Sequence, residues 1–238
     1  MNSLFIKGLT INWDKIDPGS YLQDIEAIKE VVDLTFHSPV TFFVGENGSG
    51  KSTLLEAIAV AYGFNPEGGT KNYSFSTYDS HSELYEAIRL RKGIRKAGNG
   101  YFLRAESFYN VASKEKEYAD SSHPSMELHE KSHGESFLFI AQRYINGNGV
   151  YILDEPEAAL SPQRQLTLLI EISEAVKKGA QFIIVSHSPI LLALPGAEIL
   201  TFDEGMIHPI SYEETDSYQV TEMMINNRDF LLKRLLGD

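Results

Sequence analysis

The segment from Gly45 to Thr53 reads GENGSGKST and contains the residue types that bind a chain of phosphates. It matches the pattern G-x-x-x-x-G-K-[ST], in which glycines let backbone N–H groups turn toward the β-phosphate. Lys51 can reach the β- and γ-phosphates, and the Ser52 hydroxyl can bind a magnesium ion. The sequence therefore predicts a nucleotide site made of Gly45, Glu46, Asn47, Gly48, Ser49, Gly50, Lys51, Ser52 and Thr53.

Two adjacent acids, Asp154 and Glu155, follow the apolar run VYIL. In phosphate-loop enzymes an acid at such a strand end holds the magnesium shell. The neighbouring glutamate can take a proton from the attacking water. Asp-Glu-Pro is also common in turns, so the catalytic interpretation of the two acids depends on the phosphate loop upstream.

His187 directly follows a third apolar run, QFIIVS at 181–186. Catalytic groups in open α/β sheets lie at the carboxyl ends of strands. A histidine there can hydrogen-bond the γ-phosphate or the attacking water. The alternative is a histidine that caps the next helix or packs in the core.

Apolar runs alternate with helical segments along the chain, which favours a mostly parallel sheet covered by helices. We expect one α/β domain of the phosphate-loop type over 1–238, with a β-rich part at 1–40 and the core with a C-terminal helix at 41–238. The predicted strands are 40–45, 100–108, 149–154, 181–186, 197–203 and 206–212. The predicted helices are 51–61, 82–94, 132–145 and 162–177, with one more through FLLKRLL near the end.

Composition excludes several classes of protein. The net charge of −12 means that the surface as a whole does not attract nucleic acid or anionic membrane. The absence of cysteine excludes disulfides, thiol catalysis and zinc–thiolate sites. The most apolar stretch, 182–200, is interrupted by two prolines and a glycine and cannot cross a bilayer as one helix. The first residues carry no secretory pattern, so we expect a cytoplasmic protein.

These motifs resemble those of ABC-type ATPases, in particular the SMC-like branch with standalone bacterial ATPases. GENGSGKST resembles the Walker A loop, VYILDEPEAALSP at 150–162 resembles Walker B with the D-loop, and IIVSHSP at 183–189 resembles the switch-histidine segment. The resemblance implies an ATPase with ATP and Mg²⁺ as ligands. It also implies catalytic roles for Lys51, Glu155 and His187, and metal binding by Ser52 and Asp154.

The segment SHGES at 132–136 lies where this family has its LSGGQ signature. Ser132 and Gly134 match the signature. Three other positions differ and carry Lys131, His133 and Glu135. Ser132 and Glu135 also have capping-box spacing at a helix start, which can bind an anion or can be an ordinary helix cap. The resemblance implies that Ser132 and Gly134 meet the γ-phosphate held by a second copy, so that ATP drives head-to-head dimerisation.

Two further positions depend on the resemblance. Glu106 stands where the family usually has a glutamine that binds magnesium, although its charge changes the site. Tyr21 is a candidate for the aromatic residue that stacks on adenine.

Two functions remain open. One is an ATP-driven dimerisation switch acting on nucleic acid or a partner effector, as in repair or defence. The other is the ATP-binding subunit of a membrane transporter. The interval from Glu106 to Ser132 is too short for the helical subdomain of transporter ATPases or for a coiled coil, which favours the switch. A small-molecule kinase would leave the acid pair and His187 without a role.

A basic run, RLRKGIRK at 89–96, permits two interpretations. It can form a patch for nucleic acid or a partner. It can also be a solvated helix end, where cations complement the helix dipole. The acidic net charge favours the second interpretation.

Overall fold

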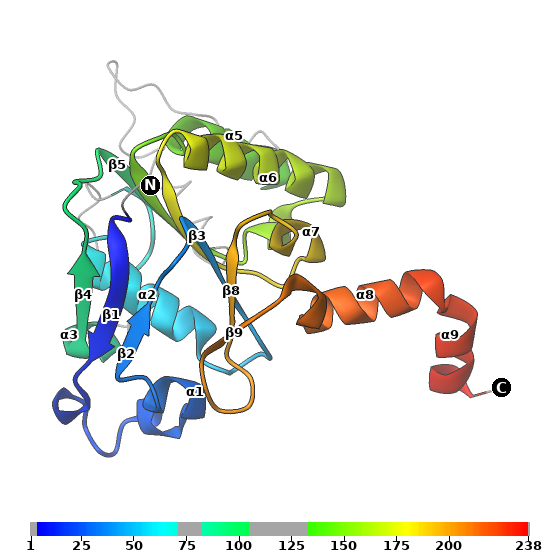
Figure 1. Cartoon of the computed structure of the whole chain (residues 1–238), viewed down its shortest axis with the longest axis horizontal. Helices are drawn as coiled ribbons and strands as arrows, with labels where there is room; N and C mark the ends of the chain where they lie inside the picture. Colours follow the sequence, from blue (N-terminus) through cyan, green and yellow to red (C-terminus); the bar gives the residue numbers. More distant parts are fainter. Residues whose placement is uncertain (1–3, 71–81, 105–132, 238) are drawn as a thin grey trace.

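The computed structural model describes residues 4–70, 82–104 and 133–237. Figure 1 shows an α/β body from which a helical arm extends to one side. The body contains a six-stranded sheet with strand order β5-β6-β7-β3-β8-β9, in which every neighbouring pair is parallel except β8–β9. This confirms the predicted mostly parallel sheet. Its strands are β3 (Val40–Val44), β5 (Asn99–Arg104), β6 (Gly149–Asp154), β7 (Gln181–Val185), β8 (Glu198–Thr201) and β9 (His208–Ile210).

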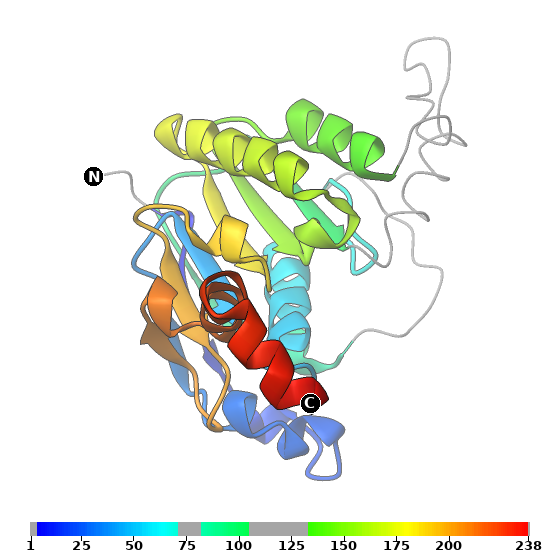
Figure 2. The same cartoon turned by 90° about the vertical axis from the view of Figure 1, so that its right-hand side faces the viewer.

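Successive residues of the central strands face two separate cores. Phe43 of β3 packs in a core with α2 (Lys51–Tyr62) and the small sheet, whereas Phe42 packs in a core with α6 (Pro162–Lys177). Every residue of β3 and β7 is buried, as expected for parallel strands covered on both faces. Figures 1 and 2 show α5 (His133–Tyr144) beside α6 on the second face.

A second, three-stranded antiparallel sheet has the order β2-β1-β4. Its strands are β1 (Ile6–Ile11), β2 (Asp33–Thr35) and β4 (Ile88–Lys92). Gln181 of β7 fastens this sheet to the large one. Its Oε1 accepts hydrogen bonds from the backbone N–H groups of Phe5 and Ile6 at 2.8 and 2.9 Å, and its Nε2 donates to the Ile6 carbonyl at 2.8 Å.

The predicted helix at 82–94 is wrong beyond residue 87. A short helix, α3 (Leu84–Ala87), is followed at once by β4, which pairs with the edge of β1 from Ile11↔Ile88 to Ile6↔Lys92. Leu, Arg and Lys favour a helix locally, but the open edge of β1 offers these backbone groups a partner. Tertiary pairing therefore outweighs local propensity in this segment.

The other predicted helices are present. Ser161 caps α6 by accepting a hydrogen bond from Arg164 N at 3.4 Å, and Pro162 is its first residue. The predicted C-terminal helix is divided into α8 (Asp216–Asn226) and α9 (Arg228–Leu236). In the described ranges no helix is long and apolar enough to cross a membrane. The short helices are η1 (Trp13–Lys15), η2 (Tyr21–Asp24), α1 (Glu26–Lys29), η4 (Pro156–Ala159), α7 (Pro189–Leu192) and η5 (Tyr212–Glu214).

Candidate nucleotide site

The phosphate loop connects the end of β3 to the first residue of α2. Two of its glycines have a positive φ, which other residues rarely adopt, and neither position has room for a side chain. Gly50 has φ 97°, and a Cβ there would lie 2.6 Å from Ile25 Cγ2. Gly45 has φ 133°, and a Cβ there would lie 2.8 Å from Asp203 Oδ1. These glycines let the loop pack tightly against α1 and the end of β8.

Lys51 is 5% exposed and lies inside the phosphate loop. Its Nζ donates hydrogen bonds to the carbonyls of Gly45 and Glu46 at 2.7 and 2.6 Å. Burial lowers the pKa of this amine, while the charges of Asp203, Glu155, Asp154 and Glu46 oppose that shift. The loop therefore encloses one cation that is balanced by nearby carboxylates.

Ser52 and Asp154 meet, as required of a magnesium pair. The Ser52 hydroxyl donates to Asp154 Oδ1 at 2.9 Å, joining the start of α2 to the end of β6. Mg²⁺ is usually held by one or two carboxylates together with substrate phosphates, so this oxygen pair fits the ion. Glu106, the other predicted ligand, lies outside the described residues.

Glu155 has an unusual backbone conformation at the end of β6. Its φ of 47° and ψ of 54° are left-handed, a conformation that costs a non-glycine residue about 1–2 kcal/mol. Its N–H donates to the Val185 carbonyl at 3.0 Å, which fixes the turn against β7. His187 Nε2 lies 3.9 Å from Glu155 Oε1, and both side chains remain partly exposed. The structure thus brings the two predicted catalytic groups together at the ends of neighbouring strands.

Glu157 was missed by the sequence analysis, although it is a third acid within four residues. Its Oε1 accepts hydrogen bonds from Ser186 Oγ at 2.9 Å and from His187 N at 2.5 Å. Its Oε2 is buried and has no hydrogen-bond partner among the described residues. Burial raises the pKa of this carboxyl, although its hydrogen bonds oppose the shift. Glu157 therefore ties η4, directly after Glu155, to the backbone of His187.

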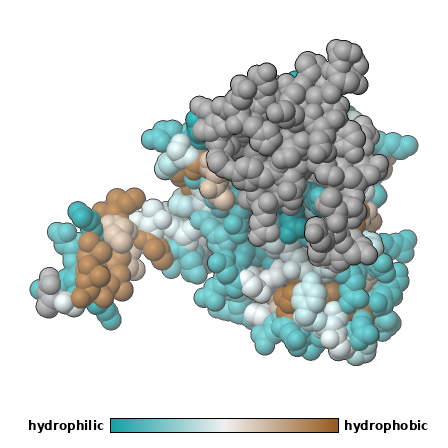
Figure 3. Space-filling view, turned by 180° about the vertical axis from the view of Figure 1, so that it is seen from behind, coloured by the Kyte–Doolittle hydropathy of each residue, from teal (hydrophilic) through white to brown (hydrophobic). Residues whose placement is uncertain are grey.

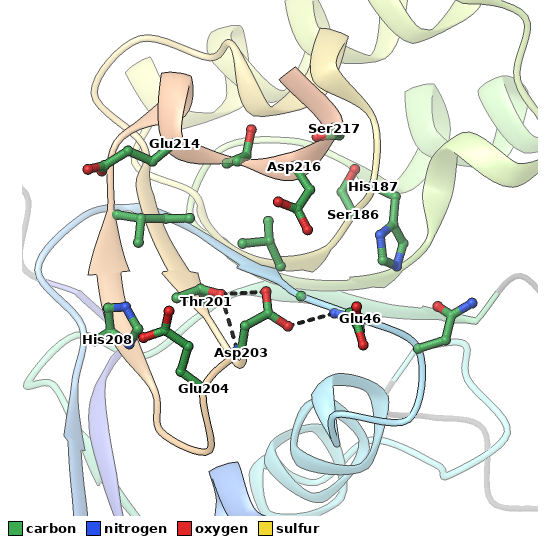
Figure 4. Close-up of a pocket in the computed structure, with 15 residues that line it drawn as sticks. Glu46, Ser186, His187, Thr201, Asp203, Glu204, His208, Glu214, Asp216 and Ser217 are labelled. Carbon is green, nitrogen blue, oxygen red and sulfur yellow. Dashed lines mark hydrogen bonds between the residues drawn. The ribbon is translucent and has the colours of Figure 1, made fainter. Parts of the chain in front are cut away.

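A cavity of about 800 Å³ lies beside the phosphate loop (Figure 4). Asp203 lies in its wall, where Oδ1 accepts from Glu46 N at 2.8 Å and Oδ2 accepts from Thr201 Oγ1 at 2.9 Å. The cavity is rich in acids. Its lining includes Glu46, Asp203, Glu204, Glu214 and Asp216, together with His187 and His208. Asp203 was also missed, because its place depends on β8 lying beside β3.

Three predicted site positions remain: Ser132, Gly134 and Tyr21. Ser132 lies outside the described residues, and Gly134 is in the first turn of α5. Tyr21 is the first residue of η2 and is 56% exposed. Ile25, four residues after Tyr21 in the sequence, packs against Gly50 of the phosphate loop.

A family model described as an AAA domain, AAA_23, matches residues 21–178. The match covers more than half of the chain, which therefore belongs to this family of ABC-type P-loop ATPases. ATP binding is a property of the family.

Curated relatives are ATP-binding proteins of import systems. The chain is 26% identical to a ribose import ATP-binding protein, RbsA, of Bacillus cereus, over 76% of this chain and 41% of that protein. It is 24% identical to the hemin import ATP-binding protein HmuV of Aliivibrio fischeri, over 71% and 72%. The chain thus spans less than half the length of the ribose import protein.

One further relative covers most of both chains. The phosphate import ATP-binding protein PstB 1 of Vibrio cholerae is 25% identical over 90% of this chain and 87% of its own. A solved ATP-binding cassette of an ABC transporter is 19% identical and covers 84% of this chain and 90% of its own, with a TM-score of 0.42.

Proposed function

We propose that this chain hydrolyses ATP with Mg²⁺, and that ATP binding brings two copies together as a switch for a partner effector or nucleic acid. One observation carries the proposal. Lys51, the Ser52–Asp154 pair and the Glu155–His187 pair come from separate segments and converge at one edge of the sheet. Family membership supports ATP as the ligand.

Each group has a role that follows from its chemistry. Lys51 and the loop amides stabilise negative charge on the β- and γ-phosphates. Ser52 and Asp154 would hold Mg²⁺, which when bound supplies positive charge to the phosphate oxygens. Glu155 accepts a proton from the attacking water, a contribution of about 10²–10⁴ in rate. His187, held by Glu157 through its backbone N–H, positions the γ-phosphate.

The second half of the site comes from another copy in this proposal. Gly134 lies in the first turn of α5, where a helix N-terminus attracts an anion, and Ser132 comes directly before that helix in the sequence. They would contact the γ-phosphate bound by the partner. ATP then joins the two copies, and its hydrolysis releases them.

A partner effector is favoured over nucleic acid, because three of the five cations of the basic run have partners within the chain. Arg91 forms an ion pair with Asp33. Arg95 donates to Asn148 Oδ1 at 2.9 Å, and Lys92 Nζ lies 5.2 Å from the centre of the Tyr62 ring. The interpretation of the run as a solvated helix end is wrong, because residues 89–92 lie in strand β4 (Ile88–Lys92) and 93–96 follow that strand.

The names of the relatives favour a second candidate, the ATP-binding subunit of an importer. Such a subunit acts through a membrane partner. Co-purification of this chain from its source cells with an integral membrane protein, and stimulation of its ATPase by that protein, would support the importer. Full ATP-dependent dimerisation and turnover without any membrane component would support the switch.

Mixing two inactive variants tests the shared site. Lys51→Ala weakens phosphate binding, and Ser132→Arg obstructs the γ-phosphate of the opposing copy, so each homodimer should be inactive. A mixed dimer regenerates one whole site from the intact Lys51 of one copy and the intact Ser132 of the other. Independent sites in a symmetric dimer should recover about a quarter of wild-type ATPase activity.

Two controls make this mixing experiment decisive. Crosslinking must show that mixed dimers form, since cooperative sites can lower the recovery. Ile170→Arg places the same cation on the exposed middle of α6 and should keep full activity. Full, concentration-independent activity of Ser132→Arg alone would show that SHGES is an ordinary helix cap.

A further inference from the structure

The arm formed by α8 and α9 lacks a core of its own. It extends away from the body in Figure 1 and toward the viewer in Figure 2. Both helices lie wholly within the described range 133–237, and neither contains a buried residue. They have 11 and 9 residues, whereas isolated helices shorter than about 12–15 residues are marginal in water. The arm therefore needs a surface to pack against.

The arm carries apolar side chains at helical spacing. Val220, Met223 and Met224 are three and four residues apart on α8, and Leu232, Leu235 and Leu236 have the same spacing on α9. Figure 3 shows apolar side chains gathered on the outer part of the arm. The most exposed are Ile225 at 74%, Leu235 at 67% and Leu236 at 78%. A group of exposed apolar residues of this kind marks an interaction surface.

The base of the arm lies at the nucleotide site. Thr215, Asp216 and Ser217, where α8 begins, line the same cavity as Gly45 to Asn47 of the phosphate loop. A second copy that docks over the phosphate loop must therefore meet the arm. This makes the arm continuous with the dimer surface of the proposed function.

Charge indicates where α9 would lie on that second copy. α9 carries Arg228, Lys233 and Arg234 against one acid, Asp229, although the chain as a whole has a net charge of −12. The cavity beside the phosphate loop is lined by acids, of which Glu46, Glu204, Glu214 and Asp216 are exposed. In Figure 1, α9 lies at the far end of the arm from the body, so the acids of a second copy are its complement.

We propose that the α8–α9 arm clasps a second copy of this chain in the ATP-bound dimer, with the basic α9 on the acidic rim of the partner's cavity. The proposal rests on the dimer of the proposed function. It adds the surface that stabilises that dimer and places it beside the partner's phosphate loop.

The test measures ATP-dependent dimerisation by sedimentation velocity in a Glu155→Gln chain, which should hold ATP without hydrolysing it. Leu235→Glu with Leu236→Glu should weaken the dimer by about tenfold or more, as for the loss of a central interface contact. Lys233→Glu with Arg234→Glu should do the same and become less sensitive to salt. Ile94→Glu, at an even more exposed apolar residue outside the arm, should leave the dimer unchanged.

A charge exchange sharpens the assignment of the partner surface. Adding Glu204→Lys to the Lys233→Glu, Arg234→Glu chain should restore part of the lost dimerisation, because each copy then offers the opposite charge at both positions. At protein concentrations where the chain is monomeric, binding of a fluorescent ATP analogue and the melting temperature without nucleotide should stay unchanged in the variants at Lys233, Arg234, Leu235 and Leu236, since the arm buries no residue.

The outcomes separate the two proposals. A Glu155→Gln chain that stays monomeric with saturating ATP overturns the dimer switch, and the arm proposal with it. A chain that dimerises with ATP equally well with and without the arm substitutions overturns the arm proposal alone. In that case the apolar arm would serve a different protein partner.

Discussion

The edge of the sheet where the nucleotide-site residues converge and the α8–α9 arm differ in how much of their surface is buried within one copy of the chain. Every residue of β3 and β7, which end at the nucleotide site, is buried. The arm begins at the same cavity, yet neither of its two fully described helices contains a buried residue. The site is thus positioned by packing within one copy, whereas the arm has surface left over for another molecule. We therefore expect substitutions at the edge to change chemistry or folding, and substitutions on the arm to change association.

The largest effect is expected at Glu155. Glu155→Gln keeps the shape of the side chain but removes its basicity, so turnover should fall by about 10²–10⁴ while ATP affinity changes little. Single-turnover ATP hydrolysis and nucleotide titration measure the two quantities. Glu30→Gln, at an exposed acid of the body, is the matched control. Near-normal turnover of Glu155→Gln would remove this residue from the mechanism.

A large effect on stability is expected at Gln181. Gln181→Ala leaves the N–H groups of Phe5 and Ile6 and the Ile6 carbonyl without their buried partner. The free energy of unfolding should fall by at least about 2 kcal/mol, since each unsatisfied buried group costs about 1–3 kcal/mol. Gln163→Ala, at an exposed residue of α6, should have almost no effect in the same denaturant titration. Equal stability of the two variants would contradict the role of Gln181 in joining the sheets.

A residue of the nucleotide site could be predicted from the sequence only where a local sequence motif marks it. The phosphate loop, Asp154, Glu155 and His187 are marked by motifs at the ends of apolar runs, so their segments could be placed without a structure. Asp203 could not, because it reaches the loop only when β8 pairs with β3. The helix predicted over strand β4 is wrong for the same reason, since the pairing of β4 with β1 is a tertiary contact.

A pH-dependent effect is expected at Glu157. Burial raises its pKa in the folded protein, so the protonated form is favoured there. The resulting stability is fully present below the unfolded pKa of about 4.3 and is lost as pH rises through the raised folded pKa. Glu157→Gln does not titrate and can still accept from Ser186 and His187. The free energy of unfolding of wild type should therefore fall relative to the variant across that window, as denaturant titrations at several pH values can show. Parallel curves would contradict the raised pKa.

The smallest effect is expected on the arm of the isolated copy, and it tests the comparison directly. Leu168 of α6 is 0% exposed, whereas Leu235 of α9 is 67% exposed. Leu168→Ala should cost about 2–5 kcal/mol in the free energy of unfolding, because it removes buried apolar contacts and leaves a cavity. Leu235→Ala, the same chemical change, should cost less than about 0.5 kcal/mol without nucleotide. Denaturant titration at low protein concentration measures both.

The comparison between the two leucines becomes sharper when ATP is added. If the arm packs on a second copy, Leu235→Ala should acquire a cost that grows with protein concentration, because a dimer stabilises the folded state by mass action. Leu168→Ala should show the same cost at every concentration. A Leu235→Ala variant that loses several kcal/mol as a monomer would mean that the arm packs on its own body. The difference between the two regions would then disappear.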